Sequence, residues 1–260
     1  MGQVDGKIAL ITGAAMGIGA ACAVRLAEEG ATIILTDIDD KTGESTAALI
    51  KSNGGRAEYL YQDVTQEDQW IALVNDIGAR HGGLDILVNN AGIAVVCESI
   101  TEMSLEDFHL QNSINLDGVF LGLKHCIPVM SGSGGGSIIN LSSVAGLKAA
   151  PSLAAYAMTK GGVRLLSKSV AKECAVAGNG VRVNSVHPGI IDTAIWNKMG
   201  LGADVPGENR TETSEIAEQS VPGGKLGVPT DIANGVVFLA SESSSYMTGS
   251  ELVIDHGLSC

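Results

Sequence analysis

KIALITGAAMGIGAACAVRLAEEGATIILTD, residues 7–37, joins two runs of β-branched and aliphatic residues through a glycine-rich turn and a segment of helical period. Ile18, Cys22 and Leu26 recur in that segment at the spacing of one helix face. A strand, a helix and a second strand in this order predict a parallel β–α–β unit.

The turn inside this unit has the features of a nucleotide site. Gly13, Gly17 and Gly19 lie where the first strand runs into the helix, so the backbone can approach a pyrophosphate at the helix N-terminus. The spacing G-x-x-x-G-x-G is looser than the dinucleotide fingerprint, and such a turn often serves only to relieve strain. Asp37 ends the second strand, where a carboxylate can bind an adenosine ribose, although it also suits a cap of the next helix.

The same rhythm continues along the whole chain. An α/β fold follows: one Rossmann-type, doubly wound parallel sheet of seven strands with helices on both faces, in a single domain over residues 1–260. SGSGGGS, residues 131–137, interrupts the rhythm only briefly and is expected to be a turn within this domain. Residues 190–228 are rich in glycine and proline, and we expect a mobile substrate loop there. The candidate strands are 7–12, 31–37, 57–64, 84–90, 136–143, 181–189 and 250–257.

Composition narrows the class of protein. The 260 residues are 45% hydrophobic, with a mean hydropathy of +0.24, which is enough for a large core. A net charge of −13 argues against a nucleic-acid partner, because phosphate binding needs clustered Lys and Arg. No apolar run reaches membrane-spanning length and no secretory signal is present, so we expect a cytoplasmic protein without a membrane partner. The five scattered cysteines favour reduced thiols, and no metal site is expected.

A second cluster of polar residues lies in AAYAMTKGG, residues 154–162. Tyr156 and Lys160 are four residues apart, so a helix places both side chains on one face. Taken alone, the pair is also compatible with a half-buried tyrosine whose ring packs on the lysine stem.

Five motifs in order give the chain a family resemblance: TGAAMGIG (12–19), NNAG (89–92), NLSS (140–143), YAMTK (156–160) and HPG (187–189). Together they closely resemble the short-chain dehydrogenase/reductase family over nearly the whole chain. The resemblance implies that Tyr156 is the general acid and base and that Lys160 assists it. It further implies that Ser143 holds the substrate oxygen and that Asn115 anchors a water in a proton relay.

The resemblance also implies a nicotinamide dinucleotide as cofactor, an alcohol or ketone as substrate and a homotetramer as the assembly. NAD is expected rather than NADP, because Asp37 would repel a 2′-phosphate and no Lys or Arg in the glycine turn offsets its charge. The cofactor is expected to contact Gly13, Met16, Gly17, Ile18, Gly19, Asp37, Ile38, Asp63, Val64, Asn89, Ala91, Gly92, Tyr156, Lys160, Pro188, Gly189, Ile191 and Thr193. The substrate is expected to contact Val95, Ser143, Leu147, Ala149, Leu153, Trp196 and Met199. These substrate positions are mostly apolar, which favours a bulky secondary alcohol or ketone, with a cyclic alcohol or a hydroxysteroid as examples.

The spacing of Tyr156 and Lys160 suits a proton transfer by the tyrosine. Free tyrosine, with a pKa near 10, is protonated at neutral pH, and a nearby lysine and an oxidised nicotinamide would depress that pKa. Alternatives are a reductase of polar sugar or acyl carbonyls, a non-catalytic NAD-sensing protein, and a methyltransferase, in which the Tyr–Lys pair has no role. His187 reads as structural, whereas His256 departs from the family pattern and is expected to be solvated, packed, or close to a neighbouring subunit or the pocket mouth.

Overall fold

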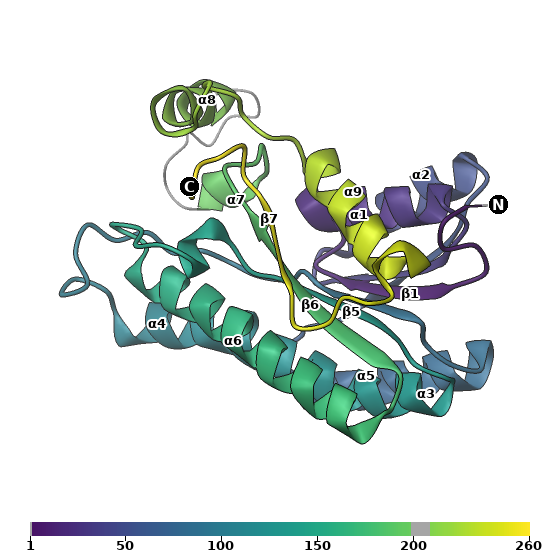
Figure 1. The fold of residues 1–260 in the computed structure, drawn as a ribbon. Helices are drawn as coiled ribbons and strands as arrows, with labels where there is room; N and C mark the ends of the chain where they lie inside the picture. Colours follow the sequence, from purple (N-terminus) through teal and green to yellow (C-terminus); the bar gives the residue numbers. More distant parts are fainter. Residues whose placement is uncertain (1, 199–208) are drawn as a thin grey trace.

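The computed structural model describes residues 2–198 and 209–260. Seven parallel strands form one sheet in the order β3-β2-β1-β4-β5-β6-β7, which confirms the predicted doubly wound fold (Figure 1). The strands are β1 (Ile8–Thr12), β2 (Thr32–Asp37), β3 (Arg56–Tyr61), β4 (Ile86–Asn89), β5 (Gly136–Leu141), β6 (Val181–Pro188) and β7 (Glu251–Ile254).

Helices cover both faces of the sheet. In Figure 1, α1, α2 and α9 lie on one side, and α3, α4, α5 and α6 lie on the other. The longer helices are α1 (Gly17–Glu28), α2 (Asp40–Ser52), α3 (Glu67–His81), α4 (Leu105–Asn112), α5 (Gly118–Gly132), α6 (Ala154–Ala177), α8 (Asn209–Ser220) and α9 (Pro229–Ala240). The shorter ones are the π-helical turn η1 (Ser113–Asp117), the 3-10 turns η2 (Val144–Gly146) and η3 (Glu242–Ser244), and α7 (Ile195–Lys198).

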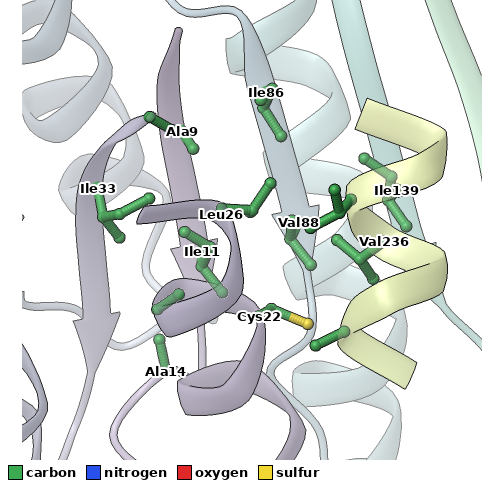
Figure 2. Close-up of a cluster of buried hydrophobic side chains, with 14 of the residues drawn as sticks. Ala9, Ile11, Ala14, Cys22, Leu26, Ile33, Ile86, Val88, Ile139 and Val236 are labelled. Atoms are coloured by element: carbon green, nitrogen blue, oxygen red, sulfur yellow. The ribbon is translucent and has the colours of Figure 1, made fainter. Parts of the chain in front are cut away.

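Each face of the sheet has its own core, because successive side chains of a strand point to opposite faces. Ile11 packs under α1 and α9, whereas its neighbour Leu10 packs under α3 and α5. Figure 2 shows the first core, with Cys22 and Leu26 of α1 and Val236 of α9 over the strands. Two buried faces explain why the strands read as continuous apolar runs rather than alternating ones.

The strand order places the ligand-binding edge. The chain winds outward from β1 to β3 and then returns to add β4 beside β1, so the direction of winding reverses between β1 and β4. In sheets of this kind, ligands bind at the carboxyl ends of the strands next to that reversal. The glycine turn follows β1 and the NNAG motif overlaps the end of β4, so both lie at this point.

The segment expected to be an irregular substrate loop contains helices in its described part. α7 and α8 lie within residues 190–228, and residues 199–208 are outside the described part of the chain. Within the described residues, no helix is both long and apolar enough to cross a bilayer.

Candidate active site

The glycine turn is shaped by contacts that only glycine permits. Gly13 has a φ of 62°, and a Cβ there would lie 2.7 Å from the Ala91 Cα atom. A Cβ on Gly19 would overlap the carbonyl oxygen of Gly13. Gly17 differs, because a Cβ there would reach Thr193 at an ordinary 3.5 Å. The turn is therefore packed tightly against the end of β4 and faces Thr193 across its open side.

Asn90 fastens this turn to β4. Its side-chain Nδ2 donates to the carbonyl oxygens of Thr12 and Gly13 at 2.9 and 2.8 Å. The adjacent Asn89 points away, and its Nδ2 donates to Asn140 inside the core at 2.8 Å. Asn90 and Ala91 therefore lie against the turn, and the cofactor contacts expected for Asn89, Ala91 and Gly92 stay predictions; Asn90 was not among the predicted residues. Strand alternation was the available signal, because two successive asparagines must face opposite sides.

Asp37 lies beside the glycine turn at the end of β2. Its carboxylate accepts from the backbone N–H of Ala15 at 3.0 Å and from that of Ile38 at 2.8 Å. The cap of α2 is Asp39, whose carboxylate accepts from the Thr42 N–H at 3.1 Å. The alternative reading of Asp37 as that cap is therefore wrong, and Asp37 instead connects β2 to the turn.

The other predicted cofactor residues border the same edge. Asp63 accepts from the Thr65 backbone and hydroxyl at 2.9 and 2.8 Å, and Val64 is buried. Gly189 donates its N–H to Ile254 at 3.0 Å, which holds the segment after β6 against β7. Ile191 is buried, and it pairs with Gly227 in an isolated β-bridge.

A dinucleotide fits this edge. α1 begins at Gly17 without a side-chain cap from Met16, so its first amides are available for a phosphate. A Cβ at Gly13 or Gly19 would clash with the backbone of Ala91 or of the turn itself, so the turn keeps its shape only with glycine, and Thr193 lies next to Gly17. Asp37 lies beside the same turn, because its carboxylate accepts from the Ala15 N–H.

The predicted catalytic residues come together on α6 and η2. The Lys160 ammonium lies 5.6 Å from the centroid of the Tyr156 ring and donates to the Leu141 carbonyl at 2.9 Å. Both side chains are buried, with exposed fractions of 9% for Tyr156 and 4% for Lys160. The Ser143 hydroxyl, just before η2, lies near enough to Tyr156 to act on the pKa of the phenol. The i, i+4 spacing therefore produces one compact group with Ser143.

Burial dominates the acidity of this group. It raises the pKa of Tyr156 to about 12, although the Ser143 hydroxyl acts in the opposite direction. It lowers the pKa of Lys160 to about 8, because an ammonium is poorly solvated there. Burial rather than Lys160 sets the direction of the Tyr156 pKa shift in this structure.

Asn115 lies in the π-helical turn η1 between α4 and α5. Its Oδ1 accepts from the Ile93 N–H at 2.9 Å, while Nδ2 donates to the Ile93 carbonyl at 2.8 Å and to the Thr159 hydroxyl at 3.1 Å. Thr159 in turn donates to the Tyr156 carbonyl at 2.8 Å. Asn115 thereby ties the irregular segment after β4 to the helix that carries Tyr156. Thr159 was missed, because its role depends on a partner 44 residues away.

An apolar cluster surrounds Tyr156. It contains Ala94 and Tyr156, with Val96, Ala145, Leu153, Ile195 and Trp196 packed against them. Leu153 and Trp196, which were predicted to line the substrate pocket, belong to this cluster, and so does Val96, the neighbour of the predicted Val95. The Val95 N–H is instead held by Gln111 at 3.1 Å. Leu147 is half-buried, Ala149 is exposed, and Met199 lies outside the described residues.

Two remaining expectations concern charged and metal-binding groups. Over residues 2–198 and 209–260, no group of three His, Cys, Asp or Glu side chains is placed to hold a metal ion. His256 is exposed with a φ of 52°, and it borders a cavity of about 260 Å³ near Val221, Lys225 and Asp231. The four predicted catalytic residues do not line that cavity.

Comparison with known proteins agrees with this geometry. A family model described as enoyl-(acyl carrier protein) reductase matches residues 13–259. Cyclopentanol dehydrogenase from Comamonas sp. (strain NCIMB 9872) is 39% identical over 99% of this chain and 98% of its own length. An NADP-dependent (R)-specific alcohol dehydrogenase from Lentilactobacillus kefiri is 40% identical over 98% of this chain and 97% of its own length.

A solved structure agrees with the sequence relatives. The crystal structure of a short-chain type dehydrogenase/reductase from Mycobacterium marinum superposes with a TM-score of 0.89 at 35% identity, covering 99% of this chain and 97% of its own. Fold, motifs and relatives lead to one conclusion. The chain belongs to the short-chain dehydrogenase/reductase family of oxidoreductases.

Proposed function

We propose that this chain is an NAD-dependent dehydrogenase that interconverts a bulky, largely apolar secondary alcohol and its ketone. The observation that carries the proposal is the buried Tyr156, next to Ser143 and Lys160 and enclosed by the apolar cluster of Leu153 and Trp196. A nicotinamide cofactor, when bound, supplies the hydride acceptor or donor. The protein groups orient the substrate and move its proton.

Each of these groups has a role in the proposal. The Ser143 hydroxyl holds the substrate oxygen next to Tyr156, whose phenolic oxygen takes the alcohol proton in oxidation and returns it in reduction. The Lys160 ammonium favours the phenolate form and binds ribose hydroxyls. Asn115 keeps the proton path in place through Thr159 and Ile93.

NAD is proposed over NADP because of Asp37. Its carboxylate stands beside the glycine turn through the Ala15 N–H, where it can accept from ribose hydroxyls but repels a 2′-phosphate. GAAMGIG, residues 13–19, and the neighbouring Ile38 provide no Lys or Arg to offset that charge. One similar chain is described as NADP-dependent, so the charge at Asp37 rather than the family carries this part of the proposal.

The size and polarity of the substrate follow from the cluster at Tyr156. Apolar walls contribute roughly 25 cal/mol per Å² of buried substrate surface, so a cyclic alcohol gains more than a small polar one. The similar cyclopentanol dehydrogenase is named for an alcohol of this kind. An acyl thioester is the second candidate substrate, because the matching family model is described as an enoyl-(acyl carrier protein) reductase, which reduces the carbon–carbon double bond of such a compound.

A substrate panel with NAD tests this proposal. Cyclic alcohols and hydroxysteroids should give higher kcat/KM than polyols, hydroxy acids, sugar phosphates or acyl thioesters. Trp196→Ala should lower kcat/KM most for the bulkiest alcohols, whereas Trp196→Phe should retain most of it. A ranking led by phosphorylated sugars or hydroxy acids, and unchanged in Trp196→Ala, would contradict the apolar pocket.

A further inference from the structure

His187 is a buried titratable group with no part in the proton transfer proposed above. It lies near the end of β6 with an exposed fraction of 0%, and both ring nitrogens have partners. Nδ1 lies 3.2 Å from the carbonyl oxygen of Ser143, and Nε2 lies 2.9 Å from the hydroxyl oxygen of Ser185. The imidazole therefore connects β6 to the residue proposed to hold the substrate oxygen.

The partners determine which nitrogen carries the proton. A carbonyl oxygen can only accept, so Nδ1 must carry hydrogen and donate to Ser143. In a neutral ring Nε2 is then an acceptor, and it takes the hydroxyl proton of Ser185. Burial lowers the pKa of His187, which favours this neutral ring.

The hydrogen bond between His187 and Ser143 lies where the pairing of β5 and β6 ends. Their last paired residues are Leu141 and Val186, and the Ser142 N–H donates to the Val186 carbonyl at 2.8 Å. One residue further, the carbonyl of Ser143 accepts from the imidazole of His187 and from the Gly146 N–H at 2.9 Å. The His187 side chain thus extends the hydrogen bonding between β5 and β6 by one residue, to Ser143.

We propose that His187 is a positioning residue, whose Nδ1–H holds the Ser143 backbone so that the Ser143 hydroxyl meets Tyr156 and the substrate oxygen. This inference rests on the proposed function. Pro188 and Gly189 are held separately, because Pro188 pairs with Ile254 and the Gly189 N–H donates to the Ile254 carbonyl. Loss of the imidazole should therefore affect Ser143 and leave the cofactor segment in place.

Two amide substitutions separate the donor from the bulk of the ring. In His187→Asn, the amide nitrogen can occupy the place of Nδ1 and still donate to Ser143. In His187→Gln, the amide reaches toward Ser185, and the donor to Ser143 is lost. Ser185→Ala is the matched control, because it removes the partner of Nε2 and leaves the Nδ1–H bond.

Three measurements should distinguish these variants. His187→Gln should lower kcat at least about tenfold, because misplacing a reacting group is costly, and the cofactor Kd should stay unchanged. Its pH profile for alcohol oxidation should move to higher pH, since the effect of the Ser143 hydroxyl that lowers the pKa of Tyr156 is weakened. His187→Asn and Ser185→Ala should stay within about threefold of wild-type kcat and keep its pH profile.

Several outcomes would overturn the inference. Equal losses in the Asn and Gln variants would mean that ring packing matters rather than the donor, and unchanged kcat in both would remove the role altogether. An Nε2–H tautomer of His187, read by ¹⁵N NMR without any turnover, would exclude the hydrogen bond to Ser143. A wild-type protein inactive on every alcohol would instead contradict the proposed function and, with it, this inference.

Discussion

Burial of Tyr156 has two opposing effects on the proposed reaction. Its ring is buried in an apolar cluster, which suits a bulky substrate, but the same burial raises the pKa of the phenol to about 12. A base that strong is almost wholly protonated at neutral pH, so oxidation depends on charges and hydrogen bonds that favour the phenolate. In this structure the Ser143 hydroxyl acts in that direction.

Replacing Tyr156 with Phe tests its proton-transfer role. The ring and its packing survive, so cofactor binding, followed by fluorescence titration, should remain nearly intact. Turnover should fall by 10²–10⁴, the usual contribution of a general acid or base. A variant that kept more than about a tenth of the wild-type rate would rule out this role.

We expect the buried charge of Lys160 to destabilise the folded state. Its pKa drops from 10.5 to about 8, so at pH 7 a charge is held in a site that disfavours it. Lys160→Met should raise the free energy of unfolding at pH 7 by about 1–2 kcal/mol, with the lost bond to Leu141 offsetting part of the gain. The same variant should lose turnover and bind the cofactor more weakly.

The pH dependence of that stability difference has a definite sign. Between pH 8 and 10.5 the unfolded lysine is protonated and the folded one is neutral, so wild-type stability rises with pH. The advantage of Lys160→Met should therefore shrink across this window in urea unfolding at a series of pH values. An advantage that is absent at pH 7, or that grows above pH 8, would contradict the buried-charge account.

Asp37 should set the cofactor preference. Two negative charges about 4 Å apart repel by about 4 kcal/mol at an effective dielectric of 20, so NAD should exceed NADP in kcat/KM by at least about two orders of magnitude. Asp37→Asn removes the charge and keeps an acceptor for the Ala15 N–H, so it should narrow the gap. Equal kcat/KM values for the two cofactors in the wild type would exclude the ribose role.

Among the elements, the β1–α1 turn shows how packing and function coincide. Gly13 and Gly19 leave no room for a side chain against Ala91 and the turn itself, so the turn can adopt only a narrow set of conformations. The N-terminus of α1 has no side-chain cap, so its first amides are available to a ligand. The tight packing of the turn therefore fixes the position of these amides.

Gly19→Ala should weaken both the cofactor binding and the stability that depend on this turn. The new Cβ would overlap the Gly13 carbonyl, so the turn must shift, and NAD affinity and thermal stability should both fall. Gly78→Ala in α3 is the matched control, because a Cβ there meets nothing within 4 Å. It should keep NAD affinity and gain roughly 0.5–1 kcal/mol of stability, as Ala does in a helix interior. Equal NAD affinity in the two variants would contradict the tight turn.

At the scale of the whole molecule, the exposed side chains bear on the predicted homotetramer. Large apolar side chains remain exposed on three helices of one face, including Leu105 on α4, Phe120 on α5 and Leu165 on α6. Apolar side chains favour contact with another protein surface where they form one contiguous patch. The family resemblance predicts a homotetramer, in which four chains of net charge −13 must also overcome mutual repulsion.

Light scattering tests this assembly directly. The measured mass should be about four times the 26.6 kDa of one chain. Moderate salt should stabilise the tetramer against dilution, because it screens the repulsion between acidic subunits. A monomer at every concentration and salt level would contradict the predicted homotetramer.

Local patterns were enough to predict the sheet, the glycine turn and the Tyr156–Lys160 pair. The apolar runs mark buried strands, the helical spacing marks crossovers, and an i, i+4 pair lies on one helix face wherever that helix packs. Each of these signals is contained in a short stretch of sequence. It does not depend on how the elements pack against one another, so it can be recognised before the structure is known.

The roles of Asn90, Thr159 and His187 depended on which segments lie side by side. Asn115 meets Thr159, and His187 meets Ser143, each across 44 residues of chain. Asp39 rather than Asp37 caps α2, because the Asp39 carboxylate is the one that accepts from the Thr42 N–H. Pattern alone specifies the elements, whereas side-chain direction and long-range hydrogen bonds are set only when strands pair in register, since one residue of shift reverses every facing side chain.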